Sequence, residues 1–320
     1  MRDAAAESRW RGQPGRLEVW YATATDSATG TGLWLHHERV APVSESGRAP
    51  YAHGWAAVFA PGGAPVLQRF GPESVSSDVP EDRPGTWLVG GSTVAGPEGF
   101  EGAAGGLAWD LRVAGDQSPM WTMPRRVWEH ELLPAAQVVV APRARFRGSV
   151  CQPSGEIQFD GIGNVAHIYG HGNAHRWAWL HADLDDATTL EIVAAVGRRP
   201  AMRWLPPLSF VQLRRAGHDD WPRNPLAAAP LFRARLGLPD WRVRGLVGDR
   251  RLTVDVSQPA DRCVSLDYTD PDGAHAICTN SEIADVDVRL ERLAGVGRGW
   301  QVEGEWTLRG TAHAERGYRD

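Results

Sequence analysis

The sequence predicts an all-β protein built from two antiparallel barrel-like or sandwich-like domains with little helix. Short segments that alternate apolar and polar residues recur along the whole chain, and Gly, Pro, Asp or Asn bounds each of them. The 3.6-residue period of an amphipathic helix is scarce. The 320 residues also suffice for two domains of ordinary size, each with a core of its own.

The expected strands follow one another closely in both halves of the chain. In the first half they are 16–26, 32–40, 51–60, 85–94, 106–115 and 136–150. In the second half they are 155–161, 175–184, 189–197, 208–217, 241–256, 261–270, 274–280 and 300–313. The best helix candidate is 224–237, and the DPDG sequence at 270–273 predicts a hairpin turn.

A break in the strand pattern between about 120 and 145 predicts the domain boundary. The sequence DQSPMWTMPRRVWEHELLPAAQ contains three prolines and then gives way to β-rich sequence. We therefore expect an N-terminal domain at 1–130 and a C-terminal domain at 131–320.

Charge and composition exclude several classes of protein. The net charge is −5, and the 34 basic residues, all arginine, are interleaved with Asp and Glu rather than gathered in a stripe. A nucleic-acid partner is therefore not expected. The amino terminus has no apolar core of a signal peptide, and no run of 18 apolar residues occurs. We expect a soluble, cytoplasmic protein without a membrane span.

Several common catalytic motifs are absent from the sequence. It contains no phosphate-binding loop, no G-x-S-x-G, no H-E-x-x-H and no C-x-x-C. Cys151, Cys263 and Cys278 are an odd number of cysteines, and in a reducing compartment no disulfide is expected.

The stretch HIYGHGNAHRWAWLH, residues 167–181, concentrates histidines and aromatic residues. His167, His171 and His175 follow one another at every fourth position, so a helix would gather three imidazoles as a metal site. Gly170 and Gly172 each cost about 1 kcal/mol inside a helix, and the following residues alternate as in a strand. No metal site is therefore expected here.

Alternation within 175–184 places Trp177, Trp179 and His181 on one face of a strand and Arg176 on the other. Two interpretations of the tryptophan face stay open. It lines a cavity that ends in a titratable group, or the tryptophans are core residues and His181 lies at the rim.

The first predicted strand places Glu18 and Trp20 on one face and Tyr21 on the other. An inward Glu18 must be paired or have a raised pKa, because an isolated buried carboxylate is costly. His36 and His37 point in opposite directions, so only one of them can face the interior, and His53 is interpreted as structural.

Two segments resemble a known family. LEVWYATATDSATGTGLWLHHE resembles the E-x-W-Y … D-x-x-x-G-x-G opening of a lipocalin-like superfamily. NVAHIYGHGNAHRWAWLHADL resembles its D-H-x-W-G … W-x-W signature. This superfamily includes carotenoid hydratases, tocopherol cyclases and fungal Diels-Alderases.

The resemblance implies two lipocalin-like β-domains packed side by side, with a ligand pocket. It also implies hydration, cyclisation or isomerisation of a lipophilic polyene, terpenoid or polyketide without a cofactor. Glu18, Trp20 and Tyr21 match the first signature, and the second is matched by His167, Gly170, Trp177 and Trp179. Ala166 replaces the acid that usually precedes the histidine, and Tyr169 replaces the tryptophan before the glycine.

These patterns and the resemblance together give a candidate site for a hydrophobic small molecule. The catalytic candidates are His167, His181, Glu18 and Tyr169. The substrate-binding candidates are Trp20, Tyr21, Trp34, Trp177, Trp179 and Arg176. A non-catalytic carrier is the alternative function, and a purely structural role is the third. Convergent, poorly solvated His or Glu side chains would favour the enzyme, whereas a wholly apolar cavity would favour the carrier.

Overall fold

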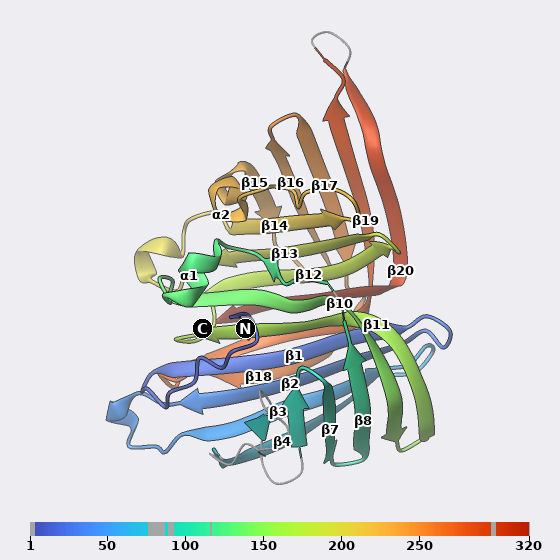
Figure 1. Cartoon of the computed structure of the whole chain (residues 1–320). Coiled ribbons are helices and arrows are strands. Elements are labelled where there is room, and N and C mark those ends of the chain that lie inside the picture. Colours follow the sequence, from blue (N-terminus) through green and yellow to red (C-terminus); the bar gives the residue numbers. More distant parts are fainter. Residues whose placement is uncertain (1–3, 76–86, 89–92, 116, 296–298, 320) are drawn as a thin grey trace. The chain divides into compact units, whose positions relative to one another are not determined.

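The computed structural model describes residues 4–75, 87–88, 93–115, 117–295 and 299–319 (Figure 1). The chain divides into two compact units. Unit 1 comprises Met1–Trp121, Arg125–Gly172 and Thr269–His275. Unit 2 comprises Thr122–Pro124, Asn173–Tyr268 and Ala276–Asp320.

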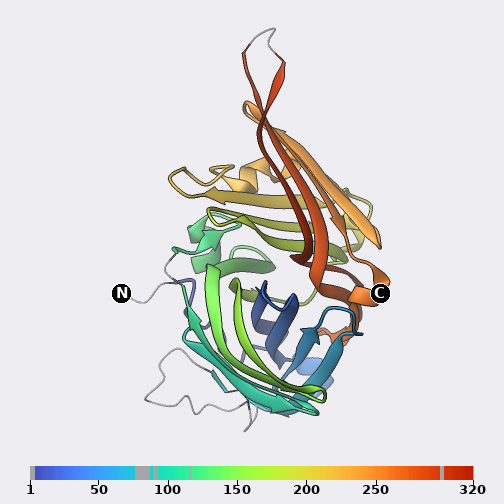
Figure 2. The same ribbon diagram turned by 90° about the vertical axis from the view of Figure 1, so that its right-hand side faces the viewer.

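Unit 1 contains one curled antiparallel sheet, which the blue to green strands form in Figure 2. Its described strands run in the order β4-β3-β2-β1-β11-β10-β8-β7-β6-β5, and β9 pairs with β10. Their bounds are β1 Arg16–Asp26, β2 Thr31–Ala41, β3 Tyr51–Phe59, β4 Val66–Ser74, β5 Trp87–Leu88, β6 Thr93–Gly96, β7 Gly99–Ala104, β8 Leu107–Ala114, β9 Met120–Trp121, β10 Ala135–Gln152 and β11 Gly155–Gly170. Two short helices accompany them, η1 Ser44–Ser46 and α1 Arg125–Glu129.

Unit 2 contains a second antiparallel sheet, in the order β14-β13-β12-β20-β19-β17-β16-β15, with β18 paired to β19. Its strands are β12 Arg176–Asp185, β13 Thr188–Val196, β14 Leu208–Arg215, β15 Phe232–Arg235, β16 Asp240–Val247, β17 Arg250–Ser257, β18 Val264–Thr269, β19 His275–Leu293 and β20 Trp300–Arg319. Its helices are η2 Pro200–Met202, α2 Pro225–Ala228, η3 Ala229–Leu231 and η4 Ala260–Arg262. The DPDG turn lies between β18 and β19, as predicted.

The all-β fold with two barrel-like sheets is confirmed. The predicted helix at 224–237 is wrong beyond its first turns, because α2 and η3 end at Leu231 and β15 begins at Phe232. From there the residues alternate, with Phe232 buried and both Arg233 and Arg235 exposed, which is the period of a strand. The helix α1 was not predicted.

The predicted boundary between residues 130 and 131 falls inside unit 1. Long strands explain this, because β10 pairs with β8 and β11 pairs with β1 across the sheet of unit 1. Apart from Thr122–Pro124, the chain passes to unit 2 after Gly172, and it returns to unit 1 over Thr269–His275. Within the predicted strand 85–94, residues 85, 86 and 89–92 lie outside the described part of the chain.

Both faces of β1 and β2 are buried along their whole length. The face with Trp20 and Leu35 belongs to the apolar core of unit 1. His37 shares that face and contacts Phe70 and Phe100, with ring centroids 5.0 and 5.7 Å apart. His36 lies on the opposite face and is buried as well, so one histidine faces this core but neither faces solvent.

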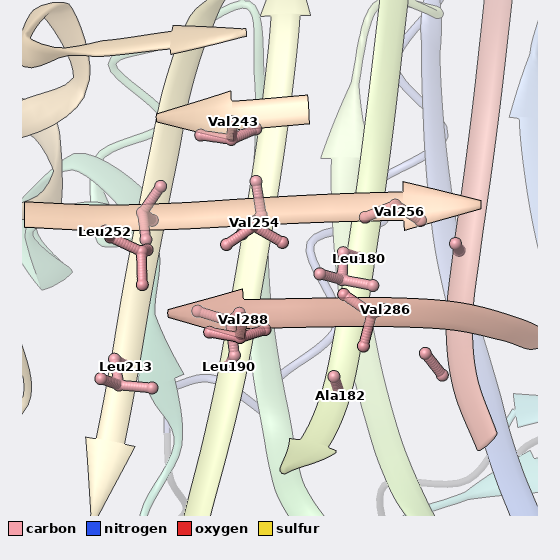
Figure 3. Close-up of a cluster of buried hydrophobic side chains, with 14 of the residues drawn as sticks. Leu180, Ala182, Leu190, Leu213, Val243, Leu252, Val254, Val256, Val286 and Val288 are labelled. Atoms are coloured by element: carbon pink, nitrogen blue, oxygen red, sulfur yellow. The ribbon is translucent and has the colours of Figure 1, made fainter. Parts of the chain in front are cut away.

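The core of unit 2 lies on one face of its sheet (Figure 3). Leu180 and Ala182 of β12 join Leu190, Val254 and Val288 from neighbouring strands in this apolar cluster. Trp177, Trp179 and His181 alternate with these residues along β12 and therefore lie on the other face. The tryptophans of this motif are thus not part of the apolar core.

Candidate functional site

Glu18 and His167 form a buried pair in unit 1. Glu18 lies in β1 and His167 in β11, with side chains 1% and 0% exposed. Nε2 of His167 donates to Glu18 Oε1 at 2.8 Å, and Nδ1 donates to the carbonyl oxygen of Ala5 at 2.9 Å. Both ring nitrogens therefore have a hydrogen-bond partner. Burial opposes ionisation of Glu18, but the hydrogen bond and charge of His167 outweigh it and lower its pKa.

The amino-terminal segment closes over this pair. Ser8 Oγ donates to Glu18 Oε2 at 2.9 Å, and the backbone N–H of Arg9 donates to Oε1. The ring of Trp20 stacks on His167 with centroids 4.1 Å apart. The pair that the sequence predicted as catalytic is therefore enclosed by residues 5–9 and an aromatic wall.

Tyr169 lies near the same end of unit 1. Its ring packs against Trp128, with centroids 4.8 Å apart, and under the guanidinium of Arg16 at 5.1 Å. Burial, reinforced by the charge of Glu131, raises the pKa of Tyr169 to about 12. Its hydroxyl is a weak acid at neutral pH.

Tyr21 and Trp34 lie on the opposite face of the sheet in unit 1. Tyr21 accepts a hydrogen bond from Gln137 at 3.0 Å. The Trp34 ring lies 5.1 Å from that of His36. These two predicted substrate-binding residues therefore do not share a face with Glu18, Trp20 and His167, because adjacent residues of a strand point in opposite directions.

The same face of unit 1 carries a buried cluster around Glu38. The Nε2 atoms of His36 and His53 lie 3.4 and 3.6 Å from Glu38 Oε2. Burial raises the pKa of Glu38 to about 7, while the charges of His53 and Arg69 oppose this shift and Asp270 adds to it. Burial lowers the pKa of His36 to about 3 and that of His53 to about 4. At pH 7 the two histidines are consequently neutral, whereas Glu38 is close to its midpoint.

In unit 2, β12 and β13 bring Trp179, His181 and Glu191 together. Glu191 accepts the indole N–H of Trp179 at 2.6 Å and the Nδ1–H of His181 at 2.9 Å. The pairing of His181 with Glu191 across the two strands places both on one face. His181 and Glu191 are both 0% exposed, so the carboxylate fixes the ring orientation of His181 through Nδ1, and Nε2 lies 3.9 Å from Asp183 Oδ2.

A second histidine–carboxylate pair lies beside the first. His313 of β20 is directly opposite His181 in the strand register, and their ring centroids are 6.0 Å apart. His313 Nδ1 lies 2.5 Å from Oε2 of Glu282, which is itself fully buried. Four ionisable side chains from four strands therefore share one face of the sheet: His181, Glu191, His313 and Glu282.

Glu315 is a further ionisable group on this face. It lies opposite Trp179 in the strand register and accepts the indole N–H of Trp177 at 2.8 Å. The thiol of Cys278 lies 3.5 Å from Glu315 Oε2. Burial raises the pKa of Glu315 to about 7, with hydrogen bonds from Trp177 and Cys278 opposing and the charge of Glu282 adding to the rise. A carboxyl group with this pKa can give or take a proton at neutral pH.

The predicted site residues are thus distributed over separate places. Trp177, Trp179 and His181 come together in unit 2, whereas His167 belongs to unit 1. Arg176 points away from the tryptophan face, and its guanidinium lies 3.4 Å from the carbonyl oxygen of Arg203.

Four carboxylate or histidine residues that share the face of Trp177, Trp179 and His181 in unit 2 were not predicted from the sequence. Glu191 carried a signal, as a single acid within the apolar run TTLEIVAAV. Glu282 lies beyond the predicted strand 274–280, and Glu315 lies beyond 300–313, whose last residue is His313. Extending the alternation of AHAE by two residues would have placed His313 and Glu315 on one face.

Of the three histidines predicted not to bind metal, His167 and His171 lie in unit 1 and have hydrogen-bond partners there, whereas His175 belongs to unit 2. His171 Nδ1 lies 2.9 Å from the carbonyl oxygen of Gly15, and its Nε2 lies 3.1 Å from Arg16. His167 is engaged with Glu18 as described above. Across the described ranges, no group of three or more His, Cys, Asp or Glu side chains is arranged to hold a metal ion. No helix in those ranges is long and apolar enough to cross a bilayer.

Comparison with known proteins identifies sequence relatives. The sequence model of the tocopherol cyclase-like family matches residues 116–316. A protein of Mycobacterium tuberculosis strain H37Rv, described as uncharacterized, is 47% identical over 317 residues, which cover 99% of this chain and 90% of the relative.

Three solved structures share the fold. A protein from Nitrosomonas europaea designated AttH has a TM-score of 0.58 at 14% identity and covers 94% of this chain and 92% of its own. CghA has the same TM-score and identity, covers 95% and 88%, and is also known in a structure with Sch210972. Kievitone hydratase from Nectria haematococca has a TM-score of 0.55 at 9% identity, with 99% and 93% coverage. At these identities the likeness concerns the fold.

Proposed function

Since the chain belongs to the tocopherol cyclase-like family, we propose that it is a cytoplasmic, cofactor-independent cyclase, isomerase or hydratase-lyase. Its substrate is a lipophilic terpenoid, polyene or polyketide. The observation that carries this proposal is the buried face of unit 2, where Glu315, with a pKa of about 7, lies beside two histidine–carboxylate pairs and two tryptophans. Titratable groups with shifted pKa values gather at functional sites.

The arrangement supplies both partners of a proton transfer. Glu315 in its protonated form can donate to an alkene or a carbonyl oxygen, and a base then takes a proton from a hydroxyl group or water. We assign the base to His181, because Glu191 holds its ring through Nδ1 and Nε2 makes no hydrogen bond within the described residues, lying 3.9 Å from Asp183 Oδ2. The Glu191 carboxylate stabilises the imidazolium that forms, and the tryptophan faces stabilise positive charge developing on a polyene.

The accessible end of this face lies at Glu315. Glu315 is an intermediate residue in exposure, whereas His181, Glu191 and Glu282 are fully buried. Trp177, 8% exposed, adjoins Glu315 and packs over Gly317, where a Cβ atom would lie 2.0 Å from the indole ring. We propose that the substrate contacts Trp177 and Glu315 first, and that His181 acts deeper in the face.

The carrier remains the alternative, and the chemistry of the face favours the enzyme. A carrier needs an apolar wall, whereas this face contains ionisable groups whose burial is costly, among them His181, Glu191, Glu282, His313 and Glu315. In unit 1, Glu18 and His167 remain candidates for acid–base work. Their enclosure by residues 5–9 supports an anchoring role for that pair.

The test is product formation from a panel of terpenoids, polyenes and polyketides, followed by mass spectrometry. Cyclisation or isomerisation leaves the mass unchanged, and hydration or dehydration changes it by one water. Binding without product throughout the panel would favour the carrier and contradict the proposed enzyme.

Variants locate the site. Trp177→Ala should lose substrate binding, while His181→Ala should keep it and lose turnover by about 10²- to 10⁴-fold, as for a removed acid–base group. Trp241→Ala is the matched control, because Trp241 is a buried core tryptophan bonded to Gln258 at 2.9 Å. It should lower stability by about 3 to 5 kcal/mol without a selective loss of binding. A folded Trp177→Ala protein with normal binding would contradict this placement.

A further inference from the structure

Two adjacent strands of unit 2 present a row of arginines on their outer surface. On β15 and β16 the buried residues alternate with Arg233, Arg235, Arg242 and Arg244, which are all exposed. In the strand register, Arg233 lies opposite Arg244, and Arg235 lies opposite Arg242. Like charges directly opposite each other destabilise a sheet. The fold alone therefore gives no reason for this arrangement.

An adjoining hollow that Arg235 and Arg242 also line contains four acids, Asp240, Asp255, Asp285 and Asp287, but within the described residues Asp255 alone of these pairs with the row. Arg242 pairs with Asp255, and Arg233 donates to the carbonyl oxygen of Pro230 at 3.2 Å. Arg235 and Arg244 make no ion pair within the described residues. The surface thus keeps a local positive charge although the chain has a net charge of −5.

The arginines line a hollow of about 670 Å³ together with exposed leucines. Leu231 and Leu246 border it and are 54% and 50% exposed. Arg251 also lines the hollow, but Glu291 neutralises it through two hydrogen bonds of 2.5 and 2.8 Å. Cationic groups beside exposed aliphatic side chains match the headgroup region of a bilayer, where charge meets phosphate and apolar groups enter the acyl boundary.

We propose that this surface, the arginine hollow of β15 and β16, docks the protein onto an anionic membrane. The choice of a membrane rests in part on the proposed function, because a lipophilic substrate resides in a bilayer and must be taken from it. None of the described residues that line the hollow is aromatic, which argues against single-stranded nucleic acid, whose bases stack on aromatic rings. An acidic protein is the other partner that such a charge would suit, and the test separates it.

The experiment is co-sedimentation of the full chain with vesicles. One set contains phosphatidylcholine alone, and the other is an equimolar mixture of phosphatidylcholine and phosphatidylglycerol. We expect binding to the anionic vesicles only, weakening as salt is raised. Equal binding to both sets, or binding to neither, would overturn the proposal; in the latter case, capture by an immobilised poly-glutamate peptide would assign the surface to acidic proteins.

Variants tie the binding to the hollow. Arg235→Gln combined with Arg244→Gln should weaken anionic-vesicle binding about 30-fold, which is about 2 kcal/mol for two basic residues. Leu246→Ser should weaken it as well. The control is Arg145→Gln with Arg147→Gln, two exposed arginines of unit 1, which should bind as the parent does. Equal losses in the control and the test variant would overturn the assignment.

This outcome is separable from that of the proposed enzyme. The arginine variants should turn over detergent-dispersed substrate at the parent rate, because they lie outside the acid–base face. Glu191→Gln should keep vesicle binding. Failure of vesicle binding with intact turnover therefore rejects the docking surface alone.

Discussion

Glu191 offers the sharpest test of the buried face in unit 2. Its carboxylate accepts two hydrogen bonds, from the indole of Trp179 at 2.6 Å and from His181 at 2.9 Å. Glu191→Ala removes both acceptors at once. Glu191→Gln keeps one oxygen, which can still accept from Trp179, and replaces the other oxygen with an amide N–H donor. His181 Nδ1 can accept this N–H only if its own proton moves to Nε2.

These contacts set the expected magnitudes. A buried donor without a partner costs about 1 to 3 kcal/mol, so Glu191→Ala should lower the free energy of unfolding by about 2 to 6 kcal/mol for its two donors. In Glu191→Gln both hydrogen bonds survive in neutral form, and the loss should be about 1 to 2 kcal/mol. Turnover should fall in both variants, because His181 then lacks the anion that orients it and stabilises its charged form.

Urea denaturation of the parent and both variants measures these differences. Trp179→Phe provides the internal control, since it removes one of the two donors. In the Glu191→Ala background it should cost about 1 to 3 kcal/mol less than in the parent. The account of Glu191 as a shared acceptor would be refuted by two results together. Glu191→Ala and Glu191→Gln would lower the free energy of unfolding equally, and the effects of Glu191→Ala and Trp179→Phe would add in the double variant.

Three further predictions concern the remaining buried groups. Burial raises the pKa of Glu38 from 4.5 to about 7. Between these two pH values Glu38 holds a proton in the folded protein and releases it in the unfolded chain. The free energy of unfolding should therefore fall as pH rises from 4.5 to 7. Relative to Glu38→Gln, the parent should lose about 3 kcal/mol over that window, and a pH-independent difference in urea denaturation would contradict it. His167→Ala should cost about 3 to 5 kcal/mol, as when a buried pair is broken, and should open residues 4–10 to limited proteolysis; unchanged protection would argue against anchoring. Glu315→Gln should remove a step near pH 7 from the pH–rate profile, and an unaltered profile would exclude Glu315 as the proton donor.

Much of the fold could be predicted locally. Whether a segment is a strand depends on alternation and on the turn residues that bound it, and both are written in the nearby sequence. The helix prediction at 224–237 failed where a proline-containing turn ended the helix and Phe232 began an alternating strand. The position at which the chain passes between units depended on the pairing of β10 with β8 and β11 with β1, which no local pattern specifies.

For the candidate site, the sequence by itself determined that Trp177, Trp179 and His181 share a face, because alternation is a property of one strand. Only the tertiary structure placed Glu191 beside His181, through the register of two neighbouring strands, and brought His313 and Glu282 there from more than a hundred positions away. It likewise decided that Glu18 and His167 are enclosed by residues 5–9. Register and burial arise from hydrogen bonding and packing between distant segments, and these give each buried carboxyl group its partner and its pKa.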